Sequence, residues 1–435
     1  MNSEYTNNIL PVNWENGMMV SQSHLAEMNH YIAHVYRNSL LNNTNPYNYG
    51  LLPAYNNKFN SLKLHTEKQG ENLYVKVEQC YVLTFDGICF YINPEKVKEG
   101  TYEAANLTAN IDLLKTNYNY ILLYLVYKPE EFKKVGAIDI EKDDFERKPF
   151  LNIDIKLTYT FIESINEVSR FEQQGNSFPV GILNVANKEN PIIEKRYIPP
   201  CVNFFSNERI AAIYDVIRTD SVSLLENTSQ VLNFVHEDSK GKLASELVMD
   251  MGLLLKNMLP IIAEINAAFK TDLKVKSPVN LVFLFKKLAL TFMSNVDSLD
   301  YRRKREIGDY FAAQYGTPND LAKIGLELID STYSHVNLFA TGLFPIKKFL
   351  DILLNLMKQI SAKGLKTKVF AADNQWEEDV RDQNRNQINQ PQQKQTIKQT
   401  KQQSQPAAPP VQQPAPSPKP DEVPDNDLWG NMVGD

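Results

Sequence analysis

The chain has little cysteine and lacks the common sequence signatures of enzymes. Its 435 residues include three cysteines, Cys80, Cys89 and Cys201, with no CxxC pair. An odd count at wide spacing excludes a disulfide framework, so we predict buried thiols in a reducing compartment. The phosphate-binding patterns GxxxxGK[ST] and GxGxxG and the hydrolase pattern GxSxG do not occur. We therefore predict that the protein is not an enzyme and holds no cofactor.

Long apolar runs and an excess of basic residues are also missing. The run LVFLFKKLAL is interrupted by Lys286 and Lys287, whereas a membrane span needs about 20 mostly apolar residues. The first residues, MNSEYTNNILPVNW, lack the basic and apolar regions of a signal peptide. The formal net charge is −6, and a nucleic-acid site would need a basic patch. We expect a cytoplasmic protein without membrane insertion or a nucleic-acid partner.

Residues 1–200 are predicted to form an antiparallel β-sandwich. The segment NLYVKVEQCYVLTFDGICFYINP alternates in polarity, and its Asp86-Gly87 pair is a hairpin turn signal. Further short strands are expected at 120–127, 154–161 and 178–185. Several short strands separated by turn residues favour a sandwich or a barrel.

One helix is expected within this region, from about Ser21 to Leu41. Ser21 or Ser23 can cap it. Its apolar residues recur every three or four positions, which predicts one buried stripe. The stripe consists of Leu25, Met28, Ile32, Val35 and Leu40.

The pair Pro199-Pro200 in RYIPPC is the predicted domain junction, because two consecutive prolines fit neither a sheet interior nor a helix interior. Residues 201–370 then show helical periodicity and predict an α-helical bundle. We expect a kink at Pro260, a cap at Ser277 with Pro278 as the first helical residue, and final helices at 318–337 and 345–361. The fold class is thus α+β, in several domains.

Residues 371–435 are predicted to be a disordered tail. Gln and Pro dominate 383–420, which cannot bury enough apolar surface to fold. The end of the chain, DEVPDNDLWGNMVGD, is acidic and gathers Leu428, Trp429, Met432 and Val433. This composition suggests a tethered docking motif, while the alternative is a solvated terminus.

Three of the six histidines, His24, His30 and His34, lie within eleven residues. His30 and His34 share a helix face with Glu27, and a spacing of four can supply two zinc ligands. The sequence has no HExxH glutamate and no evident third ligand, so we predict no metal site. His24 precedes the stripe and is expected to order the helix entry by hydrogen bonding.

Four short motifs resemble the TssK family of type VI secretion baseplate subunits. The first, WENGMMVSQSHL, matches the family's N-terminal signature at Trp14, Gly17, Met18 and His24, although Leu25 replaces an aromatic residue and Ser23 is inserted. The others, in the family's order, are NYGLLP (48–53), FDGICF (85–90) and RYIPPC (196–201).

The resemblance implies a non-enzymatic homotrimer. Its N-terminal sandwich would be a shoulder like that of phage receptor-binding proteins, followed by a helical neck. The shoulder, with Trp14, Gly17 and Met18, would contact the TssF–TssG wedge, and the histidine-rich helix would pack on the sandwich. In the family a C-terminal head contacts the membrane complex at the inner face of the bacterial envelope.

This chain departs from the family after the helices, where little length remains for a head. We expect the tail and its apolar end to replace or supplement the membrane-side contact. Three other interpretations stay open. They are a contractile phage-tail-like adaptor, a metal-dependent hydrolase that uses His30 and His34, and a plain cytoplasmic oligomerisation scaffold.

Overall fold

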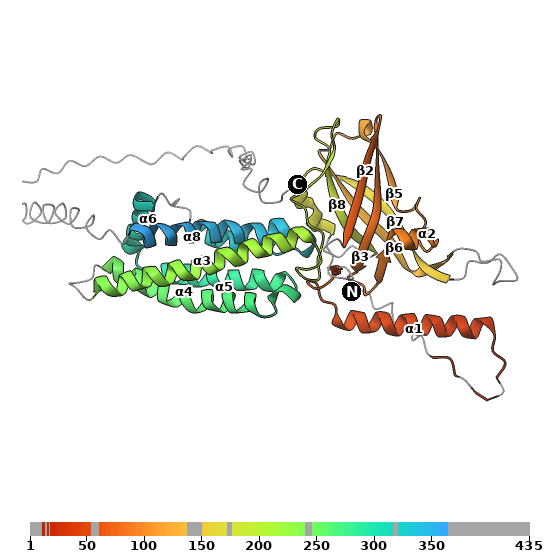
Figure 1. The fold of residues 1–435 in the computed structure, drawn as a ribbon, viewed down its shortest axis with the longest axis horizontal. Helices are drawn as coiled ribbons and strands as arrows, with labels where there is room; N and C mark the ends of the chain where they lie inside the picture. Colours follow the sequence, from red (N-terminus) through yellow and green to blue (C-terminus); the bar gives the residue numbers. More distant parts are fainter. Residues whose placement is uncertain are drawn as a thin grey trace, which may run out of the picture. The chain divides into compact units, whose positions relative to one another are not determined.

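The structure, a computed structural model, describes residues 11–53 apart from positions 14 and 17, then 61–136, 150–171, 176–239, 246–315 and 321–363. Contacts divide the chain into a unit of residues 1–365 and a second unit of residues 366–435. The predicted tail, 371–435, lies outside the described residues. In the described part, antiparallel sheets come first and helices follow, as predicted (Figure 1).

The first sheet is built around β3 (Asn72–Leu83), with which its four other strands pair in antiparallel fashion. These strands are β1 (Gly50–Leu51), β2 (Leu62–Gln69), β4 (Cys89–Ile92) and β5 (Thr108–Asp112). Alternation buries Leu73, Val75 and Val77 on one face of β3. The predicted hairpin joins β3 to β4, and Gly87 in its turn has a φ of 77°. Glycine adopts this left-handed conformation without the steric cost of a side chain.

The second sheet has the strand order β7-β6-β8-β9. Its strands are β6 (Tyr120–Val135), β7 (Phe150–Ile162), β8 (Ser177–Asn184) and β9 (Ile192–Ile193). Ile121, Leu122 and Leu123 are consecutive and fully buried, so both faces of β6 are covered. A Cβ on Gly181 of β8 would lie 2.9 Å from the Leu64 side chain of β2, which shows that the two sheets approach closely there.

Short helices connect the strands, and α1 (Gln22–Asn43) precedes them. The connections are α2 (Pro94–Lys98), η2 (Leu113–Lys115) and η3 (Ile165–Phe171). The helix predicted at 21–41 is therefore confirmed to within two residues at either end.

The helical region contains six α-helices among the described residues. They are α3 (Glu208–Ser239), α4 (Glu246–Lys270), α5 (Val279–Asp297), α6 (Tyr301–Tyr315), α7 (Leu321–Asp330) and α8 (Phe344–Lys363), with short turns η4 (Leu273–Val275), η5 (His335–Asn337) and η6 (Phe339–Leu343). Lys347 of α8 is buried, and its Nζ lies 3.5 Å from the carboxylate of Asp220 on α3. This ion pair links the two helices. α4 continues through Pro260.

Three sequence predictions were wrong, two of them about this region and one about a cysteine in β4. The helix expected at 318–337 ends at Asp330, and α6 was missed because its sequence is strongly polar. Ser277 does not cap α5; its hydroxyl donates a hydrogen bond to the Tyr47 carbonyl oxygen. Cys89 is exposed, whereas Cys80 and Cys201 are buried as expected.

α5 has the length and average apolarity of a membrane-spanning helix, although the sequence analysis found no apolar run of that kind. Less than half of its apolar window, 44%, is buried inside the protein. Phe285, Leu288 and Phe292 are among its buried side chains. This burial favours a core helix of the helical region.

β1 and the Pro199-Pro200 junction cross at very short range. The Leu51 N–H donates to the Pro200 carbonyl oxygen over 2.7 Å, and the Val202 N–H donates to the Leu51 carbonyl oxygen over 3.1 Å. Gly50 has a φ of 127°, and a Cβ there would lie 2.2 Å from the Pro200 oxygen. Only glycine fits this crossing.

We expect Gly50→Ala to destabilise the protein by about 3 kcal/mol or more, because it adds a backbone clash to a conformation that disfavours side chains. Chemical unfolding measures the change. Gly70→Ala is the matched control, because Gly70 also has a positive φ, 61°, but has nothing within 4 Å of the added Cβ. Equal losses for the two variants would contradict the role of the Pro200 contact.

Candidate assembly site

α1 begins at a complete N-terminal cap. The His24 N–H donates to the Ser21 hydroxyl over 3.4 Å, and the Ser21 N–H donates to the His24 Nδ1 over 3.3 Å. This is a capping box in which histidine takes the place of the usual glutamate or glutamine. His24 therefore orders the helix entry as expected, and the predicted cap is Ser21.

Three of the five residues of the predicted α1 stripe, Leu25, Ile32 and Val35, face outward, so the prediction of a buried stripe was wrong for them; Met28 and Leu40 are half-buried. Leu25, Ile32 and Val35 are 48%, 52% and 47% exposed, and Tyr36 is 60% exposed. The half-buried positions instead include His24, Tyr31, His34, Arg37 and Leu41. We call the exposed side chains Leu25, Ile32, Val35 and Tyr36 the α1 face.

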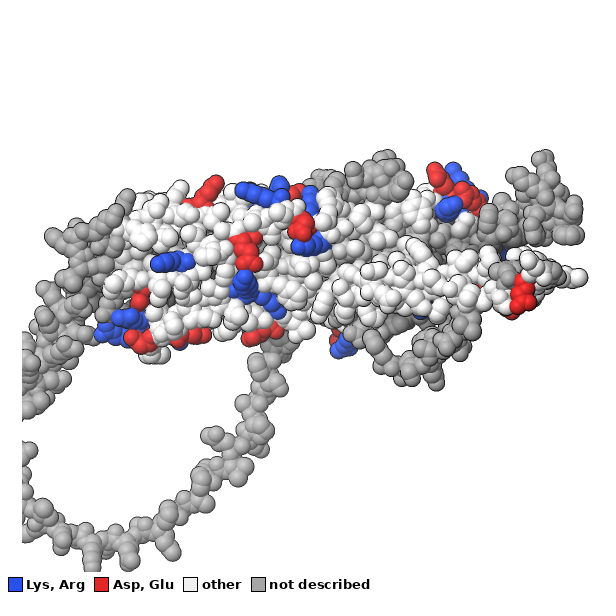
Figure 2. Space-filling view, turned by 90° about the horizontal axis from the view of Figure 1, so that it is seen from below, with Lys and Arg blue, Asp and Glu red and all other residues white. Residues whose placement is uncertain are grey.

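The α1 face is also poor in charge. The only charged residues of the helix are Glu27 and Arg37, and Arg37 is engaged with the first sheet. Figure 2, which looks from the side on which α1 lies in Figure 1, shows a largely uncharged surface there. An exposed apolar stripe with few charges is typical of a protein–protein contact.

The Asp86-Gly87 turn anchors the C-terminal half of α1. The Arg37 Nε donates to the Asp86 carbonyl oxygen over 3.0 Å, and its guanidinium lies 3.6 Å from the Asp86 carboxylate. The same carboxylate accepts a 2.7 Å hydrogen bond from the Tyr127 hydroxyl. Burial, and next the Asp86 charge, raise the pKa of Tyr127. A Cβ on Gly87 would lie 2.8 Å from the Leu41 side chain, so the turn packs closely under the helix.

The segment after α1 carries Tyr47 and Tyr49 into contact with the helical region. The Tyr49 carbonyl oxygen lies 2.7 Å from the Nε2 of His335, and the Tyr47 carbonyl oxygen accepts from Ser277. The Tyr49 ring also lies 5.5 Å from the Phe85 ring, centroid to centroid. We call the contact of residues 47–51 with residues 333–337 the joint.

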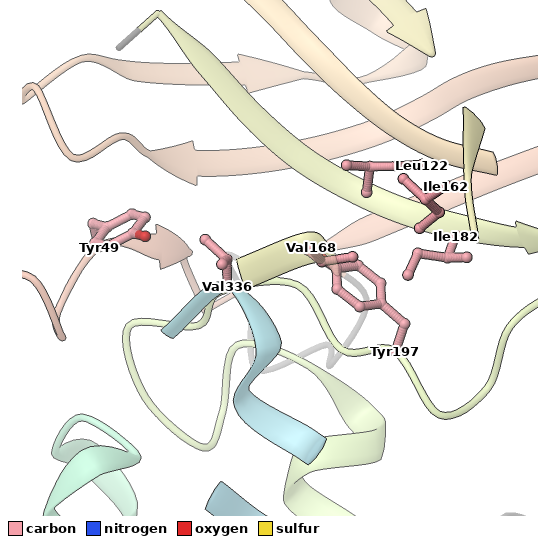
Figure 3. Packing of buried hydrophobic residues seen from close by; sticks show 7 residues of the cluster. All are labelled: Tyr49, Leu122, Ile162, Val168, Ile182, Tyr197 and Val336. Carbon is pink, nitrogen blue, oxygen red and sulfur yellow. The ribbon is translucent and has the colours of Figure 1, made fainter. Parts of the chain in front are cut away.

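A buried cluster surrounds Tyr49 and continues the joint into the second sheet (Figure 3). Its members are Tyr49, Leu122 of β6, Ile162 of β7, Val168 of η3, Ile182 of β8, Tyr197 and Val336 of η5. At roughly 25 cal/mol per Å² of buried apolar surface, such a cluster contributes several kcal/mol. The second sheet and η5 therefore share one core.

The structure brings three of the four family-like motifs together. NYGLLP contacts RYIPPC through Gly50 and Pro200, and it contacts FDGICF through Tyr49 and Phe85. Of the predicted site residues, Met18 is half-buried and its N–H donates to the Glu15 carbonyl oxygen. Trp14, Gly17 and the tail residues Leu428, Trp429, Met432 and Val433 lie outside the described residues.

His30 and His34 do not gather further candidate ligands. The His34 Nε2 lies 2.9 Å from the Asn38 amide nitrogen, and His30 is exposed. No group of three or more His, Cys, Asp or Glu side chains that could hold a metal ion is found in the part of the chain that the structure describes.

A second exposed apolar face lies on α4 and α5, and sequence periodicity did not single it out. Met249 and Leu253 on α4, and Phe283 and Leu290 on α5, are each more than half exposed. Six of the exposed α4 residues follow steps of four and three, which suits packing along another helix: Met249, Leu253, Lys256, Pro260, Ala263 and Ala267. Asn257, Glu264 and Lys270 are exposed beside them. We call Met249, Leu253, Phe283 and Leu290 the α4–α5 face.

The comparisons with known proteins gave structural neighbours only. No family model and no curated protein matches the chain. The solved structures similar to it include a TssK–TssF–TssG baseplate subcomplex of the type VI secretion system, with 13% identity, a TM-score of 0.44, and coverage of 80% of this chain and 99% of that one. That structure is of a secretion-baseplate complex.

The particular protein in these structures is TssK, the one that the motifs resemble. TssK from the type VI secretion system of EAEC, solved with a nanobody, has 13% identity and a TM-score of 0.41, and covers 77% of this chain and 98% of that one. A crystal structure of TssK has 13% identity and a TM-score of 0.44, and the match covers 80% of this chain and 70% of that one.

We expect Asp86→Ala to cost about 2 kcal/mol, because the buried Tyr127 hydroxyl loses the carboxylate that accepts its hydrogen bond. Urea unfolding measures the loss. Adding Tyr127→Phe should recover part of it, because the hydroxyl that lost its acceptor is then removed. Strictly additive losses in the double variant would rule out this coupling.

Proposed function

We propose that this chain is a non-enzymatic structural adaptor of a type VI secretion baseplate, located in the cytoplasm at the inner face of the envelope. It would join the TssF–TssG wedge to the membrane complex. The support is that three motifs far apart in the sequence, each like one of TssK, contact one another around the joint and the α1 anchor.

The described elements suit the domains that the sequence predicts. The two sheets would form the β-sandwich shoulder, 1–200, and the helices from α3 on would form the neck bundle, 201–370. Pro199 and Pro200 would mark the junction between them. Their tight crossing with β1 would hold the first strand of the shoulder directly at the start of the neck.

The α1 face is the observation that carries the proposal. A helix of 22 residues with a complete cap is fixed by Arg37 and Leu41, yet exposes its apolar stripe. Leaving such a stripe in water forgoes its burial, so a partner groove is the natural place for it. We assign this face to the wedge proteins, together with the neighbouring motif residues Trp14, Gly17, Met18 and His24.

The α4–α5 face would form the contact between three copies of the chain. Its spacing suits helix packing along a shared axis, and Ala263 and Ala267 allow close approach. A hollow of about 510 Å³ next to Phe283 adds a recess at one end of this face. With two separate apolar faces, each chain could bind the other copies through the α4–α5 face and the wedge proteins through the α1 face.

The tail, 371–435, would carry the membrane-side contact. Its length of polar and proline-rich sequence suits a tether, and the apolar residues Leu428, Trp429, Met432 and Val433 at its end suit a docking motif. Three tails on one trimer would raise the avidity for a repeated partner.

We expect Ile32→Asp to weaken binding to a TssF–TssG complex at least 10-fold, because a carboxylate would be buried without a partner in an apolar contact. Calorimetry or surface plasmon resonance on the full chain measures the affinity. Circular dichroism checks that the fold is unchanged, which we expect because Ile32 is half exposed.

Ala33→Asp is the matched control for this experiment. It adds the same charge to the same helix at an exposed position about 100° around the axis from Ile32. Its affinity should stay close to that of the unchanged protein. Equal affinities for the Ile32→Asp and Ala33→Asp variants would exclude the α1 face as the wedge contact.

We expect Leu290→Glu to convert a trimer into single chains, because three like charges would meet at the shared helices. Light scattering of the full chain gives the mass. Val222→Glu on α3, where Val222 is 39% exposed, is the control and should leave the trimer intact. If the Leu290→Glu variant still has the mass of a trimer, the α4–α5 face is not the contact between the copies.

A further inference from the structure

A histidine is buried where the helical region meets the segment before β1. His335 in η5 is fully buried. Its Nε2 lies 2.7 Å from the Tyr49 carbonyl oxygen, and its Nδ1 lies 2.9 Å from the Tyr333 hydroxyl. Its ring also stands edge-on to the Tyr49 ring, with centroids 4.9 Å apart. The imidazole therefore connects the two sides of the joint directly.

The two hydrogen bonds suit a neutral imidazole. A carbonyl oxygen can only accept, so Nε2 carries the hydrogen toward Tyr49. In the neutral ring Nδ1 is then an acceptor and takes the hydrogen of the Tyr333 hydroxyl. Protonation would add a hydrogen to Nδ1, so that the Tyr333 hydroxyl could only accept from the ring and its own hydrogen would lose its acceptor, and it would place a charge in the core. The hydrogen bonds of the closed joint therefore favour the neutral form of the His335 imidazole.

The surroundings of His335 contain further buried polar atoms that the fold leaves unsatisfied. The Tyr197 hydroxyl, the Ser334 hydroxyl and the Asn337 Oδ1 have no hydrogen-bond partner among the described residues. Ser334 and Asn337 flank His335 in the chain, and Tyr197 belongs to the cluster around Tyr49. Each such group costs free energy in the closed state and would regain water on opening.

The ionisable groups around the joint offer little to offset a positive charge on His335. Burial, as the main cause, lowers the pKa of His335 to about 4, and the Tyr49 carbonyl opposes this only in part. Among the described residues, the other ionisable groups on the elements packed here are the hydroxyls of Tyr47, Tyr49, Tyr333 and Tyr197, the thiol of Cys201, the Glu167–Arg170 pair of η3, the Glu194–Arg196 pair beside Tyr197, and Lys286 of α5, which binds the Ile329 and Ser331 carbonyls and interacts with the Asp330 charge.

We propose that the joint is a proton-sensitive contact, in which protonation of His335 releases the Tyr49 carbonyl and separates residues 333–337 from the segment before β1. Closed, the joint holds a neutral ring between Tyr49 and Tyr333. Open, the ring reaches water and carries its charge there. Acidification thus favours the open joint without any change in the proposed binding faces.

The direction and size of the effect follow from proton linkage. The pKa of His335 is about 4 in the closed joint and 6.5 when the ring is in water. The contribution of the neutral ring is complete above pH 6.5 and is lost as the pH falls toward 4. Between pH 8 and pH 5, the equilibrium constant for opening should rise about 30-fold.

Hydrogen exchange of the full chain, read by mass spectrometry between pH 5 and pH 8, tests the proposal. Peptides that cover 47–52 and 333–343 report on the joint once the intrinsic pH dependence of exchange is removed. We expect their opening constant to rise about 30-fold at pH 5. His335→Gln should abolish this rise, because the glutamine amide can still donate to Tyr49 but does not titrate. His236→Gln on α3, an exposed histidine, should preserve it.

Tyr333→Phe keeps the test decisive if His335→Gln does not fold. This variant removes the donor to Nδ1, which stabilises the neutral ring, so the pKa of His335 in the closed joint should move toward 6.5 and the rise between pH 8 and pH 5 should be smaller than about 30-fold. Exchange at the joint that does not change with pH in the unchanged protein would overturn the proposal. A full rise in the His335→Gln variant, or an undiminished rise in Tyr333→Phe, would overturn it as well.

Discussion

The position of one residue, Tyr49, determines how the described parts of the protein hold together. Its carbonyl oxygen binds His335, its ring packs on Phe85 and on the cluster of the second sheet, and the next residue crosses Pro200. At Tyr49, a backbone hydrogen bond and the burial of an aromatic ring therefore stabilise the same residue. The packing of both sheets and η5 therefore depends on a short segment that belongs to no long strand or helix.

Rigidity at this segment has consequences for α1. The helix ends at Asn43, only a few residues before Tyr47 and Tyr49, and its C-terminal half is fixed again by Asp86. A surface that is held at two places loses less conformational entropy when it binds than a free arm would. The α1 face is thus suited to a contact that must have a defined direction, as in a large assembly.

The sequence predicted well those elements that depend on residues close together in the chain. The Asp86-Gly87 hairpin, the buried run at 120–127 and the helix at 21–41 follow from turn chemistry and periodicity, which act over a few residues. It did not predict that Ser277 would bind Tyr47, because that contact joins residues 230 positions apart. The joint and the role of His335 were missed for the same reason, since nothing local marks a buried histidine.

The outward-facing stripe of α1 is the most informative difference between sequence and structure. Periodicity reports that a face needs apolar surroundings, but it does not say which chain supplies them. In α1 the half-buried side carries His24, Tyr31 and Arg37 together with Met28 and Leu40, while Leu25, Ile32 and Val35 are left exposed. A helix stabilised only by its own chain would have the opposite arrangement. The exposure of Leu25, Ile32 and Val35 is the reason for the proposal that a second molecule covers this side of α1.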